Sequence, residues 1–180
     1  MNKISYKIAL GGVMASVCLL LMFLTAVFPL LSMAIPIYAG AILVIVAVEI
    51  DSCWAFVTYA ACAFLCLFIT PDKEAVVLFI FFFGYYPVLR RILEKKIHFK
   101  PAVWVCKVAV FTAAIIAAYY FIINVFGIYD LTEEFGFLGK HMVLILILFA
   151  EGMFILYDTT LAMLETVYVK WFRKTYLGKK

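Results

Sequence analysis

Long apolar segments separated by short polar ones run through the whole chain, and this pattern predicts its fold. Each apolar segment is continuous, which is typical of membrane-spanning helices of about 20 residues and not of the alternating strands of a membrane barrel. We expect an all-α integral membrane protein, with one transmembrane domain over residues 1–180 folded as a compact bundle of about six helices. The helices are expected at residues 8–28, 35–48, 53–69, 75–93, 102–126 and 141–169.

The segment at residues 74–100 sets the expected orientation. Its apolar run at 75–89 carries no charge, and a basic group follows directly: Arg90, Arg91, Lys95, Lys96 and Lys100. Since Lys and Arg accumulate in short cytoplasmic loops, this helix should end in the cytoplasm. Both termini then lie in the cytoplasm as well. The run at 8–28 is longer than the apolar core of a signal peptide, so we interpret it as the first transmembrane helix.

Composition agrees with a membrane protein. The chain is 68% hydrophobic and 14% charged, with a mean hydropathy of +1.15, whereas about half of a soluble domain is apolar. The net charge of +4 comes from basic residues beside apolar segments, which indicates orientation signals and contacts with the lipid bilayer, not with nucleic acid. The five cysteines are expected to be buried thiols; we expect no metal site and no cofactor.

Two local features of the fourth helix allow a prediction. Pro87 lies among Gly84, Tyr85 and Tyr86, so we expect a kink and a freed backbone carbonyl that a neighbouring helix must satisfy. The charged segment at 70–74 should cap the start of the same helix.

Three acidic residues lie within the last apolar segment. Glu151, Asp158 and Glu165 are spaced by seven residues and therefore lie on one stripe of the helix. A charge at the bilayer centre costs about 2.5 to 3.5 kcal/mol, so Glu151 and Asp158 should face the bundle interior or a partner. Three interpretations stay open: pairing with Tyr side chains, Asn124 or Lys107 of neighbouring helices, contact with a helix of another subunit, or handling of an ion or substrate. Glu165 is expected at the membrane interface.

Small residues on the first helix form two pairs with a spacing of four. Gly11 with Ala15, and Gly12 with Ser16, allow another helix to approach closely. Such pairs indicate either packing inside the bundle or a subunit interface.

The sequence lacks the motifs of common enzyme classes. It contains no H-E-x-x-H zinc motif, no phosphate-binding glycine loop and no nucleophile elbow, and its histidines are His98 and His141. We therefore do not expect an enzyme.

The whole chain resembles the S components of energy-coupling factor (ECF) transporters. The resemblance rests on six predicted helices, cytoplasmic termini and the opening KIALGGVMASVCLLLMF, which looks like their first helix. It implies a multi-pass protein of the bacterial plasma membrane that captures a vitamin-like small molecule or ion for uptake. It also implies partners, namely a T component that contacts the small-residue face of the first helix, and two ATPase subunits. The start of the chain lacks the histidine cluster of nickel or cobalt members.

The resemblance also implies a substrate site near the outer surface, under the connections at 29–35, 70–74 and 127–140. Aromatic walls with few polar groups are typical of small-molecule sites. Asp72, Lys73 and Asp130 could recognise charge. The full set of candidate residues is Tyr38, Trp54, Asp72, Lys73, Tyr120, Asn124, Tyr129 and Asp130.

Two other functions remain as alternatives. In a non-transporting scaffold of a cell-envelope complex, the stripe of Glu151 and Asp158 would bind a partner helix. In a proton- or cation-coupled carrier the same acids would handle the ion, although the chain shows no internal repeat of the kind such carriers have.

Overall fold

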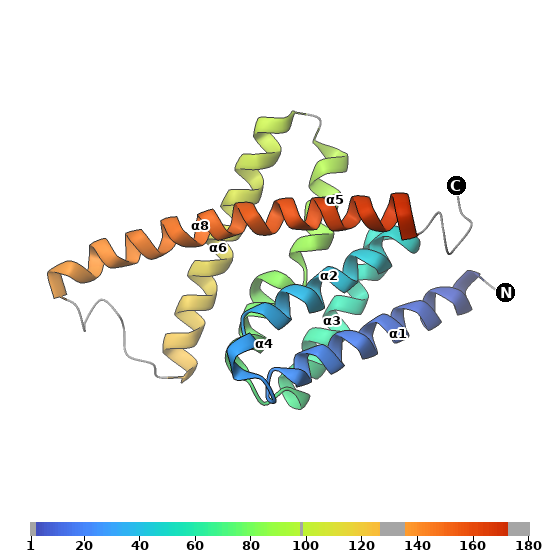
Figure 1. The fold of residues 1–180 in the computed structure, drawn as a ribbon, viewed down its shortest axis with the longest axis horizontal. Helices are drawn as coiled ribbons and strands as arrows, with labels where there is room; N and C mark the ends of the chain where they lie inside the picture. Colours follow the sequence, from blue (N-terminus) through green and yellow to red (C-terminus); the bar gives the residue numbers. More distant parts are fainter. Residues whose placement is uncertain (1–2, 98, 127–135, 173–180) are drawn as a thin grey trace.

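The structure is a computed structural model that describes residues 3–97, 99–126 and 136–172 (Figure 1). Within these ranges the chain is helical and has no strand. Five stretches are long and apolar enough to cross a membrane, and a shorter apolar helix lies between the first two of them. The predicted helical bundle is therefore confirmed, with boundaries that differ by a few residues.

The elements follow one another with short connections. In chain order they are α1 (Lys3–Leu24), the 3-10 turn η1 (Pro29–Leu31), α2 (Ala34–Glu49), α3 (Ser52–Ile69), α4 (Lys73–Leu78), the π-helical segment η2 (Phe79–Phe83), α5 (Tyr86–Lys96), α6 (Lys100–Phe126), α8 (Gly136–Val167) and the π-helical segment η3 (Tyr168–Phe172). The last helix begins at Gly136, so residues 136–140, expected in a loop, are helical. Residues 127–135 of that loop lie outside the described ranges.

The first three helices pack together and form one part of the core (Figure 1). Its buried residues include Cys18 on α1, Leu43 on α2 and Cys62 on α3, and Phe79 packs on them from η2. Three of the five free cysteines, Cys18, Cys62 and Cys66, are fully buried; Cys53 is exposed and Cys106 half-buried. The expectation of buried thiols thus holds for the three that face this core.

The long helix α8 lies across the rest of the bundle, in contact with α2 and α6 (Figure 1). Its central part contributes Phe154 and Tyr157 to a second, aromatic part of the core, together with Phe82, Tyr86 and Phe111. Towards its start, Ile145, Leu148 and Phe149 are exposed.

The fourth predicted helix is interrupted, as its glycine and proline indicated. The π-helical segment η2 separates α4 from α5, and the Gly84 N–H bonds the Phe79 carbonyl, five residues back, at 2.8 Å. The Tyr59 hydroxyl on α3 donates to the Ile80 carbonyl at 2.6 Å. A neighbouring helix therefore satisfies a carbonyl of the irregular segment, which is what a chain in an apolar environment requires.

Gly40 lets α2 approach this irregular segment closely. Pro87 has no N–H to bond the Phe83 carbonyl four residues before it. A Cβ atom added at Gly40 would overlap that same carbonyl. The α2 backbone thus lies directly against the point where the helix is interrupted.

The connection between α3 and α4 is held by its own charged residues. The Asp72 carboxylate accepts the Ala75 N–H at 3.1 Å, which caps α4 as predicted. The Lys73 ammonium donates to the carbonyls of Leu67 and Thr70, at 2.9 and 3.0 Å, at the end of α3.

Substitution of Gly40 by Ala should destabilise the protein, because the new methyl group would force α2 away from Phe83. Overpacking of this kind costs about 1 to 3 kcal/mol. Gly152→Ala is the matched control, since nothing lies within 4 Å of a Cβ there, and it should leave the protein unchanged or stabilise it by up to about 1 kcal/mol. Thermal unfolding in detergent measures both; equal unfolding temperatures would contradict the close approach.

Candidate functional site

A cluster of charged side chains, buried at its centre, lies where α5, α6 and α8 meet. We call it the ionic cluster; its members are Arg90, Arg91, Glu94, Lys107, Asp158 and Glu165. At its centre Asp158 and Lys107 are each 3% exposed and Arg90 is 6% exposed. Burial this deep requires that each charge have a partner.

Asp158 has donors on both of its carboxylate oxygens. Oδ1 accepts a hydrogen bond from the Tyr86 hydroxyl and lies 3.1 Å from Nε of Arg90. Oδ2 accepts from the Lys107 ammonium at 2.8 Å. One side chain of α8 thereby joins α5 and α6.

The outer members complete the charge balance. Glu94 lies 2.8 Å from Lys107 and 2.9 Å from Arg90. Glu165 lies 3.1 Å from Arg91 and 3.6 Å from Arg90. Each of the three cations therefore has a carboxylate partner, and each of the three carboxylates has a cation.

Arg90 differs in one respect from its expected role. The sequence predicted it as a basic residue at the end of its helix that contacts lipid. It is instead buried and paired with carboxylates, whereas Lys107, which the sequence offered as a partner for the acids of the last helix, does pair with Asp158. A basic residue near a helix end has the same sequence context in both situations, and its acidic partner lies far along the chain, so the pattern could not distinguish them.

The acidic stripe of α8 is divided between two environments. Asp158 bonds Lys107 and Tyr86, which is the pairing between neighbouring helices that the sequence left open. Glu151 is half-buried and accepts from the Thr112 hydroxyl of α6 at 2.7 Å. Asn124 was the third partner considered for these acids. Its side-chain amide instead donates to the Tyr120 carbonyl of its own helix.

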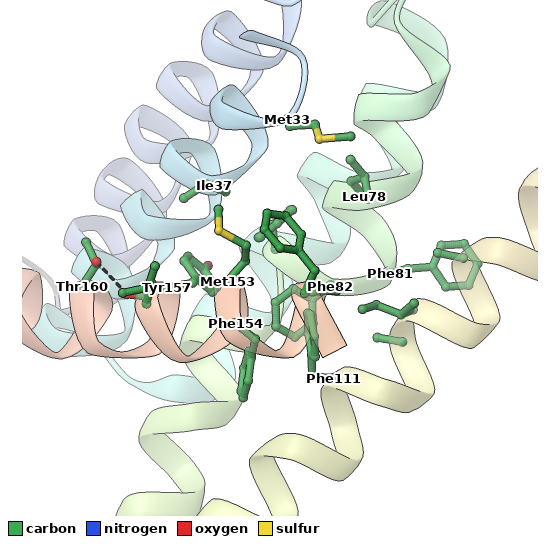
Figure 2. Close-up of a pocket in the computed structure, with 17 residues that line it drawn as sticks. Met33, Ile37, Leu78, Phe81, Phe82, Phe111, Met153, Phe154, Tyr157 and Thr160 are labelled. Atoms are coloured by element: carbon green, nitrogen blue, oxygen red, sulfur yellow. Dashed lines mark hydrogen bonds between the residues drawn. The ribbon is translucent and has the colours of Figure 1, made fainter. Parts of the chain in front are cut away.

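A cavity of about 560 Å³ is lined in part by Tyr157, the neighbour of Asp158 in the chain. Figure 2 shows the residues that line it. Its walls come from the start of α2, from α4 and η2, from the middle of α6, and from α8. Aromatic, aliphatic and methionine side chains make up nearly all of its lining. They include Met33, Ile37, Leu78, Phe81, Phe82, Phe83, Phe111, Ala114, Ala118, Phe149, Met153, Phe154, Leu156, Tyr157 and Thr160.

The cavity and the ionic cluster share a wall of stacked rings. Phe82 stacks on Tyr86 with ring centroids 4.6 Å apart, and Phe111 stacks on Phe154 at 4.5 Å. Tyr157 lines the cavity and its ring lies 5.8 Å from that of Tyr86. Since the Tyr86 hydroxyl bonds Asp158, this ring reaches from the aromatic core to the charges.

The structure does not bring the predicted substrate residues together. Tyr38 and Tyr120 are each 63% exposed, and neither they nor Trp54 line the cavity. Trp54 lies near the start of α3, 5.8 Å from the Lys7 ammonium. The end of α3 at Ile69 is about 22 Å away along the helix axis, at 1.5 Å per residue.

The polar members of that set bond within their own segments. Asp72 and Lys73 bond backbone groups of the α3–α4 connection, and Asn124 bonds its own helix. Tyr129 and Asp130 lie outside the described residues. Sequence reasoning missed the cavity residues on η2 and α8, although Phe82 with Tyr86 and Phe154 with Tyr157 have the spacing that places two rings on one helix face.

The two small-residue pairs of α1 face different surroundings. A Cβ atom at Gly11 would lie 3.3 Å from the Thr58 hydroxyl of α3, and the Ala15 carbonyl lies 3.9 Å from the Cys62 sulfur. This pair packs inside the bundle. Gly12 has nothing within 4 Å of a Cβ position, and Ser16 is exposed and bonds the Gly12 carbonyl at 2.9 Å. The second pair therefore faces outward.

Comparison of the chain with protein-family models, with curated proteins and with solved structures finds no match.

Removing one partner of the Lys107–Asp158 pair should destabilise the bundle strongly. Lys107→Met leaves Asp158 with Arg90 as its cation partner, and Asp158→Leu leaves Lys107 with Glu94 as its carboxylate partner. Each single variant thus removes a charged hydrogen bond at a buried site, which costs about 1.5 to 3 kcal/mol. The double variant removes both charges and should recover part of this loss. Unfolding of the parent protein, the two single variants and the double variant in detergent measures the coupling free energy between Lys107 and Asp158.

Glu151→Gln is the control for this series. It keeps an acceptor for the Thr112 hydroxyl, so the loss should stay below about 1.5 kcal/mol. Single variants as stable as the parent protein, or a double variant whose loss equals the sum of the two, would contradict the pairing.

Proposed function

We propose that this protein is the substrate-capture membrane subunit of an ECF-type transporter, and that the cavity is its substrate site. The observation that carries the proposal is the cavity itself. Its volume of about 560 Å³ falls within the range of about 300 to 1,000 Å³ that is usual for small-molecule sites. Its walls come from four parts of the chain, so an occupant would contact most of the bundle at once.

The proposed orientation places six crossings in a bacterial plasma membrane, with both termini in the cytoplasm. The exposed residues Lys95, Lys96 and Lys100 around the α5–α6 connection support it, because basic residues accumulate on the cytoplasmic side. The connections α1–α2 and α3–α4 then face outward. Met33, in the α1–α2 connection, lines the cavity, so in this orientation the cavity would have an outward-facing side.

The outward-facing pair on α1 is the proposed contact for the T component. Gly12 and Ser16 present a surface without bulky side chains, which a partner helix can approach closely. The energy for uptake would come from the ATPase subunits bound to that partner. Asp158, paired with two cations and a tyrosine, serves in this account to hold α8 and not to carry an ion.

A membrane scaffold is the second candidate, and one observation favours it. The exposed residues Ile145, Leu148 and Phe149 near the start of α8 offer an apolar helix face on which a partner helix could pack. In that account the partner chain takes the place of a substrate.

Purification from the native membrane in mild detergent separates the two candidates. We expect a T-type membrane subunit and a pair of ATPases to co-purify with the tagged chain, together with a small molecule. Recovery of cell-envelope assembly proteins, with no ATPase pair, would contradict the transporter and support the scaffold.

Substitution of Gly12 by Leu should reduce recovery of the T component at least tenfold, because the new side chain would separate the two helices. Val13→Leu is the matched control, since Val13 is exposed on the same helix and already carries a branched side chain. Quantitative mass spectrometry of the purified complexes measures both. Equal recovery with the two variants would rule out this face as the contact.

A further inference from the structure

The polar side-chain groups of the residues that line the cavity are not available to a ligand inside it. Among its described lining residues, Tyr157 and Thr160 carry the polar side-chain atoms. The Thr160 hydroxyl donates to the Leu156 carbonyl of its own helix at 2.7 Å. The Tyr157 hydroxyl is buried below the surface, without a hydrogen-bond partner among the described residues. An occupant of the cavity therefore meets ring faces, aliphatic groups and thioethers.

This lining discriminates strongly between classes of ligand. A polar group that loses its hydrogen bonds to water without replacement costs about 2 to 7 kcal/mol, and a charged group costs more. Each buried methylene group contributes about 0.8 kcal/mol in the favourable direction. Polar vitamins and ions are thus disfavoured at this site, and a hydrocarbon chain is favoured.

The mouth of the cavity is as apolar as its interior. Met33, Phe149 and Leu156 lie on the rim and are 72%, 69% and 62% exposed. Phe149 and Leu156 continue into the exposed apolar face of α8, where Leu148 and Ile155 also lie. In a chain that spans a membrane this face contacts lipid, so a ligand can enter from the bilayer without passing through water.

We propose that the cavity takes the hydrocarbon chain of a single-chain amphiphile of the fatty-acid class, which enters from the bilayer along α8. This inference rests on the proposed function and names the substrate class of the same site. A single chain fits better than a phospholipid, because two long acyl chains together exceed the cavity volume of about 560 Å³.

Photo-labelling in lipid nanodiscs tests the assignment. The probe is stearic acid with a diazirine on its chain, and the labelled peptides are mapped by mass spectrometry. We expect labelling to concentrate on the cavity-lining segments of η2, α6 and α8, and an excess of unlabelled stearic acid should reduce it at least tenfold. Labelling spread evenly over the exposed helix faces, without competition, would overturn the proposal.

Adjacent alanines of α6 provide matched variants. Ala118 lines the cavity, whereas Ala117 is exposed. Ala118→Phe should fill the cavity and reduce the competed labelling at least fivefold, while Ala117→Phe should leave it unchanged. The competition experiment needs no variant, so the proposal stays testable if Ala118→Phe does not fold.

Three further outcomes bear on this inference, and the last two separate it from the proposed function. A phosphatidylcholine probe with the same diazirine that labels the cavity as strongly as stearic acid would overturn the single-chain assignment. Co-purification of ATPases and a T component with a polar compound in the cavity would leave the transporter standing and reject the fatty-acid class. Labelling of the cavity that unlabelled stearic acid competes away, with no ATPase or T component co-purifying, would support the fatty-acid class and reject the transporter.

Discussion

Asp158 is buried within an apolar bundle, and its need for partners determines where α8 lies. The carboxylate is satisfied where Lys107, Arg90 and Tyr86 converge, and these come from the two helices that precede α8. Because an unpaired buried charge would cost several kcal/mol, any register of α8 that separates Asp158 from these partners is disfavoured. Glu165, two turns further along, reinforces the same register through Arg91 and Arg90.

The register of α8 in turn creates the cavity. Phe154 and Tyr157 lie four residues and one residue before Asp158 on the helix, so the ionic cluster brings them against Phe82 and Phe111. The interrupted helix supplies the opposite wall, because the π-helical segment η2 turns consecutive phenylalanines towards α6 and α8. The charged cluster and the apolar cavity are therefore two consequences of one packing arrangement.

The sequence predicted the helices well and their contacts poorly. Continuous apolar runs of nearly 20 residues have few alternatives to helix, and the glycine and proline at 84 and 87 located the interruption. Contacts depend on which face each helix presents to which neighbour. Lys107 and Asp158 are 51 residues apart, and Tyr86 and Asp158 are 72 apart, so no local pattern connects them. The predicted substrate residues were chosen by expected depth alone, which does not specify a helix face, and Tyr38 and Tyr120 lie exposed, away from the lining of the cavity.

The central claim is that the pairing of Asp158 holds α8 in place and leaves an apolar cavity for a hydrocarbon chain. An experimental structure of the protein in lipid nanodiscs tests it most directly. The account predicts Asp158 within hydrogen-bond distance of Lys107 and Tyr86, with elongated, unbranched density between η2, α6 and α8. A cavity closed by its own side chains, or occupied by ordered water or a polar ligand, would contradict it.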